Sequence, residues 1–352
     1  MINTAFMSPK EQNYSMPAEW EKHECCWMQW PHDNQDFDGY GSVPTWSHFD
    51  IEKGRIAWAN VASKISEFEK VKMIVHPNNI VNASKLLNEK VEILNFKNDD
   101  AWARDSGAIF LLNKEKKLGG VDWEFNGWGK FSPYDSDNKI AKFMIENANA
   151  TYFKNDMILE GGSIHTDGDG TLLTTEQCLL NKNRNPEFSQ EQIEGNLKDY
   201  LGVNKIIWLK NGTDEGTDGH IDNMACFVAP GKILALSCSD KQDTFYDKIN
   251  ENLEILKTSV DSKGRVLEII ELEMPYKRLI PNDDEPSSYI NFYIANKGIV
   301  MPSFDDEKAD NNAQKIIEEI FPNRKVIAIN GIDISMGGGN VHCITQQQPL
   351  SV

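Results

Sequence analysis

Five polar turns recur along this chain at a spacing of roughly 50 to 70 residues, each between short apolar runs. One unit reads as a strand, a polar turn, a strand, a tight turn, a strand and a helix. Five such units closed into a ring would bring all five turns to one central axis. An ordinary α/β fold with evenly spaced loops is the alternative, and spacing alone leaves both open. The turns cover residues 99–107, 159–165, 216–223, 287–292 and 337–342.

Helical and extended patterns alternate from end to end, which is typical of an α/β protein. No low-complexity linker or change in composition divides the chain. We therefore expect one domain over residues 1–352, with residues 1–15 as a disordered lead-in. The predicted helices cover residues 51–69, 81–89, 137–147, 189–201, 243–259 and 308–321. The predicted strands cover residues 71–75, 108–112, 170–174, 205–209, 232–236, 266–272, 289–294, 298–301 and 325–329.

The net charge and the spacing of the cysteines exclude several classes of partner and metal site. A net charge of −18, from 36 Lys and Arg against 54 Asp and Glu, argues against a nucleic-acid partner and is compatible with a small cationic substrate. No secretion signal and no apolar stretch long enough to cross a membrane are present, so we expect a cytoplasmic protein without a membrane partner. The six cysteines include no Cys-x-x-Cys pair, so we expect reduced thiols and no zinc or redox motif.

A run of three glycines, residues 337–339, stands four residues before Cys343. Consecutive glycines cost backbone entropy in a helix or strand, but they permit a ligand to approach the backbone closely. A flexible loop before a buried cysteine is the alternative reading. Taken alone, the run does not decide between the two.

Three other turns carry ionisable residues. Residues 98–107 place carboxylates, among them Asp105, beside Trp102, a combination suited to holding a cation. Residues 159–165 place Glu160 before two glycines. In residues 217–223, an extended strand would point His220 and Asp222 to the same face, as acid–base chemistry requires. Each turn also has a purely structural interpretation. In the order given, these are a surface ion pair, a glutamate exposed to solvent, and a His–Asp hydrogen bond that only supports the fold.

Cys343 is the candidate nucleophile of this set. His342 is its neighbour, but adjacent side chains of an extended segment face opposite ways, so we favour His220 as the base. A thiol, a histidine and several carboxylates suit attack on a planar cation, and a guanidinium is the obvious one because carboxylates bind it in bidentate fashion.

These motifs together resemble the agmatine deiminases, within the Porphyromonas-type peptidyl-arginine deiminase family of the guanidine-modifying (pentein) superfamily. The resemblance runs from about residue 16 to the C-terminus. It implies a five-bladed α/β propeller with fivefold internal repeats, in agreement with the spacing of the turns. The motifs that carry it are residues 16–21, 99–107, 159–163, 217–223, 289–295 and 337–349.

The resemblance implies a role for each candidate. Cys343 would attack the guanidinium carbon, and His220 would protonate the departing ammonia and then activate water. Glu160 would hold the guanidinium and assist proton transfer, Asp105 and Asp222 would bind its nitrogens, and Trp102 would line the pocket. The reaction would convert agmatine to N-carbamoylputrescine and ammonia through a thiouronium adduct, in polyamine biosynthesis. No metal or organic cofactor would be needed, and we expect a homo-oligomer, a dimer or higher.

Three positions depart from the family pattern and make the far end of the substrate uncertain. Gly216 stands where a glutamate is usual, Ile332-Asp333-Ile334 where Arg-Glu-Ile is usual, and Cys238 where a tryptophan is common. Deimination of another guanidine, such as free arginine or peptidyl arginine, is therefore the nearest alternative. A non-catalytic binder of cations is a second, although it would not need the thiol. A cysteine amidohydrolase is a third, and the number of carboxylates argues against it.

Overall fold

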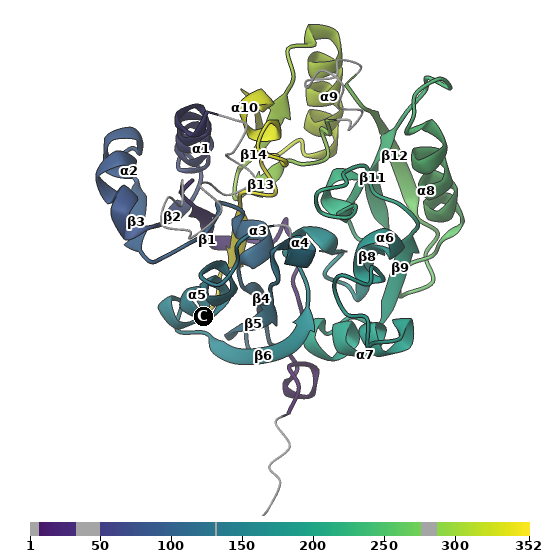
Figure 1. Cartoon of the computed structure of the whole chain (residues 1–352). Helices are drawn as coiled ribbons and strands as arrows, with labels where there is room; N and C mark the ends of the chain where they lie inside the picture. Colours follow the sequence, from purple (N-terminus) through teal and green to yellow (C-terminus); the bar gives the residue numbers. More distant parts are fainter. Residues whose placement is uncertain (1–6, 33–49, 131, 276–286) are drawn as a thin grey trace, which may run out of the picture.

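A computed structural model describes residues 7–32, 50–130, 132–275 and 287–352. In these residues the strands form five small sheets. In Figure 1 the sheets surround a common centre, and the longer helices lie on the outside of the ring. This arrangement confirms the predicted α/β class with five small sheets and is compatible with the expected five-bladed propeller.

Each sheet pairs its first two strands in antiparallel and its next strand in parallel. The first sheet contains β16 (Gln346–Pro349), β1 (His23–Gln29), β2 (Lys70–Val75) and β3 (Val91–Asn95). The second contains β4 (Ile109–Leu112), β5 (Leu118–Glu124) and β6 (Thr151–Ile158). The third contains β7 (His165–Thr166), β8 (Thr171–Thr175) and β9 (Lys205–Leu209). The last two contain β10 (Ala225–Ala229), β11 (Lys232–Ser237) and β12 (Glu268–Glu273), and β13 (Tyr293–Ala295), β14 (Gly298–Ser303) and β15 (Lys325–Asn330).

The longer helices form where the apolar spacing predicts them. Helix α7, for example, begins with a capping box between Ser189 and Gln192 and ends at Gly202 with a positive φ of 67°. Helix α9 buries Ala313 and Ile317 and exposes its charged side. The helices are α1 (Ile51–Ile65), α2 (Ile80–Leu86), α5 (Ile140–Asn147), α7 (Gln190–Leu201), α8 (Tyr246–Thr258) and α9 (Glu307–Ile320), with short turns α3 (Ala103–Ser106), α4 (Gly127–Lys130), α6 (Glu176–Leu179) and α10 (Ile332–Ser335). No helix in the described ranges is both long and apolar enough for a membrane span.

Two predictions about local structure are corrected. The strand expected at 289–294 begins only at Tyr293, and the preceding residues form a turn. Residues 7–15, expected in a disordered lead-in, contain a 3-10 helix at Lys10–Gln12 and the buried Tyr14, which packs on Phe153. Residues 1–6 lie outside the described part of the chain. Strands β1, β3, β5, β6, β7, β10 and β16 were not predicted.

The five polar turns occupy equivalent places in the five sheets. Each turn immediately precedes the first strand of its sheet, which is β4, β7, β10, β13 or β16. Short helical turns occur at or beside them, including α3, η5 (Gly161–Ser163) and η6 (Ile221–Asn223). The repeat therefore presents five equivalent turns to the centre, where α3 lies in Figure 1.

The first sheet joins the two ends of the described chain. Strand β16 pairs with β1, so that Cys25 lies opposite Gln348. The Gln348 Oε1 accepts a hydrogen bond of 3.0 Å from the Trp27 indole, and both side chains are buried. We call the pairing of β16 with β1 the closure of the ring. The hydrogen bond between Trp27 and Gln348 crosses it and gives each of these buried polar groups a partner.

Replacing Gln348 by Ala tests the closure. The Trp27 indole N–H would lose its partner inside the protein, so we expect the free energy of unfolding to fall by about 1–3 kcal/mol. Urea unfolding followed by tryptophan fluorescence measures the change. Gln314→Ala on α9, whose amide donates to the exposed Glu318, is the matched control and should change stability by less than ~0.5 kcal/mol. Equal effects of the two substitutions would contradict the assignment.

Candidate active site

Cys343 lies in the turn before β16, with 6% of its surface exposed. The Asn291 side chain donates from Nδ2 to the Cys343 sulfur over 3.1 Å. The sulfur lies 3.5 Å from the Asp222 Oδ2. The Asn291 Oδ1 also accepts the His342 backbone N–H at 2.9 Å, so one amide holds both the thiol and the backbone that carries it. The turn at residues 287–292, in which the sequence indicated no catalytic side chain, therefore contacts the predicted nucleophile directly.

Asp222 and His220 lie together, although the predicted strand is wrong. The segment is the 3-10 turn η6, with His220 at its N-cap. A turn of this kind brings both side chains to the centre without the alternation of a strand. The Asp222 Oδ2 contacts the His342 Nδ1 at 2.9 Å, whereas its Oδ1 is buried with no hydrogen-bond partner among the described residues.

Asp105 is carried by α3 and is held through both of its oxygens. Its Oδ1 accepts the backbone N–H of Gly162 at 2.9 Å, and its Oδ2 accepts the indole N–H of Trp128 at 2.9 Å. Trp128 has a left-handed backbone, with φ of 52°, between Gly127 and Gly129, whose φ values are also positive. Such a conformation is unfavourable for a tryptophan, and the hydrogen bond to Asp105 helps to offset its cost.

Glu160 is buried just before η5 and pairs with Arg184. The Arg184 Nε donates to Glu160 Oε1 over 2.6 Å. The other oxygen, Oε2, lies 3.9 Å from the His220 Nε2. One face of Glu160 is therefore neutralised by a fixed cation, and the other faces the imidazole.

Two glycines permit the close packing of this centre. A Cβ added to Gly162 would lie 2.5 Å from His220 Nδ1 and 2.8 Å from Asp105 Oδ1. A Cβ added to Gly339 would lie 2.6 Å from the Trp102 ring and 3.1 Å from the Cys343 sulfur. The absence of a side chain at Gly339 therefore leaves room for the Trp102 indole and the Cys343 thiol, in addition to any room it leaves for a ligand.

Burial and neighbouring charges shift the pKa values of the site. Burial, reinforced by Asp222 and Asp105, raises the pKa of the Cys343 thiol well above its usual value. Burial raises the pKa of Asp105 to about 6, against the field of His220. Burial opposes charge on His220, but the Asp105 carboxylate prevails and raises the pKa of that imidazole. A protonated thiol and a charged imidazole are thus favoured without a ligand.

The charge on Asp222 and Glu160 is stabilised despite burial. Burial alone would raise both pKa values, but hydrogen bonding from His342 lowers the pKa of Asp222, and Arg184 lowers that of Glu160. Two buried carboxylates therefore stay ionised around a centre with free acceptor positions.

The cavity over the thiol contains aromatic rings and one carboxylate. It is small and lined by Trp102, Asp105, Trp128, Gly216, Thr217, Gly337, Gly338 and Cys343. Trp102 packs edge-on against Trp58, with ring centroids 5.5 Å apart. Of the three positions that depart from the family pattern, the cavity is lined by Gly216; Asp333 lies in α10 and Cys238 follows β11, and neither is among the described lining residues.

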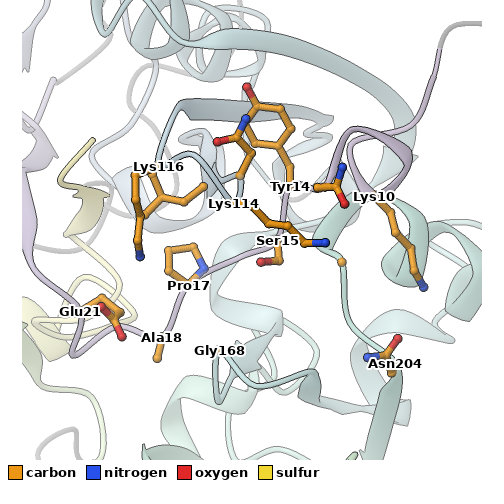
Figure 2. Close-up of a pocket in the computed structure, with 14 residues that line it drawn as sticks. Lys10, Tyr14, Ser15, Pro17, Ala18, Glu21, Lys114, Lys116, Gly168 and Asn204 are labelled. Atoms are coloured by element: carbon orange, nitrogen blue, oxygen red, sulfur yellow. The ribbon is translucent and has the colours of Figure 1, made fainter. Parts of the chain in front are cut away.

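A larger cavity lies elsewhere, near the N-terminal segment (Figure 2). Its lining includes Lys10, Lys114, Lys116 and Glu21, together with uncharged residues such as Tyr14 and Asn204, and none of the predicted site residues. Of these two cavities, the central one is therefore the candidate active site.

Two buried groups contain donors that metals use. They are Glu19 with His165 and His342, and Glu160 with Cys178 and His220. An arginine already pairs with the glutamate of each, since Arg104 reaches Glu19 at 3.2 Å and Arg184 reaches Glu160 at 2.6 Å. Their guanidinium groups supply the positive charge that a metal would supply, which disfavours a cation at either place.

Some residues of the site were not predicted from the sequence. Asn291 lies in the turn at residues 287–292, where the sequence indicated no catalytic side chain, and Arg184 lies in no recognised motif. Trp128 did have a signal, because a tryptophan between two glycines is unusual in a strand or helix. Glu19, inside the motif of residues 16–21, contacts His342 at 2.9 Å.

Comparison with known proteins gives consistent results over the whole chain. Residues 15–349 match the sequence profile of the Porphyromonas-type peptidyl-arginine deiminase family. The agmatine deiminase of Pseudomonas aeruginosa (strain UCBPP-PA14) is 40% identical, with 97% of each chain covered. That of Medicago truncatula is 37% identical, with 97% of this chain and 98% of the relative covered. A solved structure of agmatine deiminase from Enterococcus faecalis superposes with a TM-score of 0.90 at 34% identity, covering 99% of each chain.

The environment of Cys343 predicts slow alkylation at neutral pH. Its raised pKa keeps the thiolate scarce, so modification by iodoacetamide should accelerate as pH rises into the alkaline range. At pH 8, Asp222→Asn should accelerate it, because the carboxylate disfavours the thiolate. Asn291→Ala should slow it, because the amide donor favours the thiolate; each unit of pKa changes the thiolate fraction about tenfold. Peptide mass spectrometry follows Cys343, and the opposite order of the two variants would contradict the assigned contacts.

Proposed function

This chain belongs to the Porphyromonas-type peptidyl-arginine deiminase family, and we propose that it hydrolyses agmatine to N-carbamoylputrescine and ammonia through a covalent adduct on Cys343. The observation that carries this proposal is the position of the thiol, 3.5 Å from Asp222 in a centre that also holds Asp105, Glu160 and His220. A thiol alone suits many reactions, but a thiol among three buried carboxylates suits a cationic electrophile.

The unpaired atoms of the site support a guanidinium as that cation. Asp222 Oδ1 and both ring nitrogens of His220 are buried without a hydrogen-bond partner in the described part of the protein. Glu160 directs one oxygen toward His220 while Arg184 holds the other. A bound guanidinium would give its N–H groups to these carboxylates and so satisfy acceptors that are costly to bury alone.

The first half of the reaction replaces ammonia by sulfur. The positive charge of the substrate would lower the pKa of Cys343, whose proton would leave to solvent. The thiolate would attack the guanidinium carbon and form a C–S bond, as the C=N electron pair moves to nitrogen. The His220 imidazolium would protonate the departing nitrogen, and the C–N bond would break to release ammonia and leave a thiouronium adduct.

The second half uses water and restores the thiolate. Neutral His220 would take a proton from water as the oxygen attacks the thiouronium carbon. The C–S bond would then break with its electron pair on sulfur, leaving the ureido product. Ammonia takes up the remaining proton, so one agmatine cation and one water yield N-carbamoylputrescine and ammonium. We assign Asp105 and Asp222 to the guanidinium nitrogens and Glu160 to binding and proton transfer.

The lining of the cavity favours agmatine over arginine. Trp102 and Trp128 offer apolar faces to an aliphatic chain. None of the described residues that line the cavity is Lys or Arg, so it offers no cation to the α-carboxylate of free arginine. We further propose a single catalytic domain, a cytoplasmic location, a place in polyamine biosynthesis and a homo-oligomeric assembly.

Turnover of three guanidines tests the proposal. Purified protein should release ammonia and a ureido product from agmatine, and much less from free arginine or a peptidyl arginine. Cys343→Ser should lose turnover while still binding agmatine in calorimetry. Turnover of arginine alone would assign the alternative substrate. No turnover of any of the three, with equal binding by both proteins, would leave a non-catalytic binder.

Trp128→Phe tests whether the strained turn serves Asp105. The substitution keeps the ring but removes the indole donor, so we expect kcat/KM for agmatine to fall about tenfold, consistent with the loss of one hydrogen bond to a charged group. Trp208→Phe is the matched control, because its indole bonds the half-buried Glu194 on the outer face of the ring. Unchanged kinetics in Trp128→Phe would remove Trp128 from the site.

A further inference from the structure

His342 bridges two carboxylates behind the thiol. Its Nδ1 lies 2.9 Å from Asp222 Oδ2, and its Nε2 lies 2.9 Å from Glu19 Oε1. All three side chains are buried. Both ring nitrogens are therefore engaged, and neither is directed to the neighbouring Cys343 sulfur.

The chemistry of this bridge indicates the protonation state of His342. An ionised carboxylate only accepts hydrogen bonds, so a ring between two of them must donate from both nitrogens. Only the imidazolium can do so. The alternative, a neutral ring with a proton on one carboxyl group, would keep an ionised partner in only one of the two buried hydrogen bonds.

From this geometry we propose that His342 is a positioning residue: a permanently charged imidazolium that fixes Asp222 through one oxygen and thereby leaves the other free for the substrate. The inference rests on the proposed function, because it concerns the carboxylate assigned to the guanidinium. In the part of the chain that the structure describes, Asp222 Oδ1 is buried without a hydrogen-bond partner, while Oδ2 is shared by His342 and the thiol.

The groups around His342 act on its charge in opposite directions, and the two carboxylates prevail. Arg104 on α3 donates to Glu19 at 3.2 Å and to the His342 carbonyl at 3.3 Å. His165 on β7 reaches the other oxygen of Glu19 at 3.6 Å. A small void beside the ring is otherwise lined by Cys226 and by Ile290, Phe292 and Ile294. Burial and Arg104 disfavour charge on His342, but Glu19 and Asp222 prevail and raise the pKa of the imidazole.

The hydrogen bond from His342 also gives the two oxygens of Asp222 different roles. Oδ2 contacts His342 and the thiol, and Oδ1 is left for the substrate. If Asp222 could turn about its χ2 angle, either oxygen could face the substrate and either could face the thiol. The hydrogen bond from His342 selects one arrangement before the substrate arrives. Preorganisation of this kind strengthens substrate binding because the cost of ordering is already met.

His342→Gln tests the positioning role by separating KM from kcat. Glutamine is neutral and donates from only one nitrogen, so it cannot replace the charged hydrogen bonds to both Asp222 and Glu19. We expect kcat/KM for agmatine to fall about 10- to 100-fold, mainly through a higher KM, the order expected for one charged hydrogen bond. A merely structural role would instead reduce the amount of folded, active protein and leave KM unchanged.

The control is His165→Gln. His165 contacts Glu19 at 3.6 Å but does not take part in the bridge to Asp222, so KM should stay within about threefold of the wild-type value. Glu19→Gln, which removes the far end of the bridge, should raise KM in the same direction as His342→Gln. An unchanged KM in both His342→Gln and Glu19→Gln, or a matching rise in His165→Gln, would overturn the proposal.

Nuclear magnetic resonance tests the charge without any turnover. The chain has 7 histidines, so ¹⁵N-histidine labelling with His342→Gln as reference identifies the signal. We expect both ring nitrogens to carry protons at neutral pH and into the alkaline range. One bare ring nitrogen at pH 7 would overturn the inference even in an active enzyme. Two protonated nitrogens in a protein that turns over no guanidine would keep the inference about charge while the proposed function fails.

Discussion

The pairing of β16 with β1 determines the rest of the architecture. It completes the first sheet with a strand from the far end of the chain and closes the ring of five. Each sheet places one turn at the centre, so closure is what brings the fifth turn, with Cys343, among the other four. The stability of the site therefore depends on contacts such as Trp27 with Gln348, although neither touches the thiol.

A second constraint is the balance of buried charge. Buried carboxylates are costly unless cations compensate them. Here Arg184 compensates Glu160, while Arg104 and His342 compensate Glu19 and Asp222. Within the described part of the central site, Asp222 Oδ1 and both ring nitrogens of His220 are buried without a hydrogen-bond partner, and this is where a substrate is expected to lie. The protein thus keeps fixed positive charge behind the carboxylates and leaves their front unpaired.

The sequence predicted much of this arrangement because local signals coincide with it. The six longer helices follow apolar spacing and caps, as in α7 with Ser189 and Gln192. The candidate residues were recognisable as motifs beside turns. Strand β16 was not predictable, since Gln346, Gln347 and Gln348 have no strand preference and become extended through β1. The same holds for Asn291 and Arg184, whose roles come from partners distant along the chain or outside any motif.

The position of the thiol near the end of the fifth unit has a consequence for biosynthesis. The ribosome makes the turns in order, so Asp105, Glu160 and Asp222 are synthesised well before Cys343. Until the chain reaches residue 343, the acidic centre lacks its thiol, although the strands β4, β7 and β10 that follow the three acidic turns are already made. A nascent chain stalled before residue 343 would therefore carry the carboxylates without the sulfur.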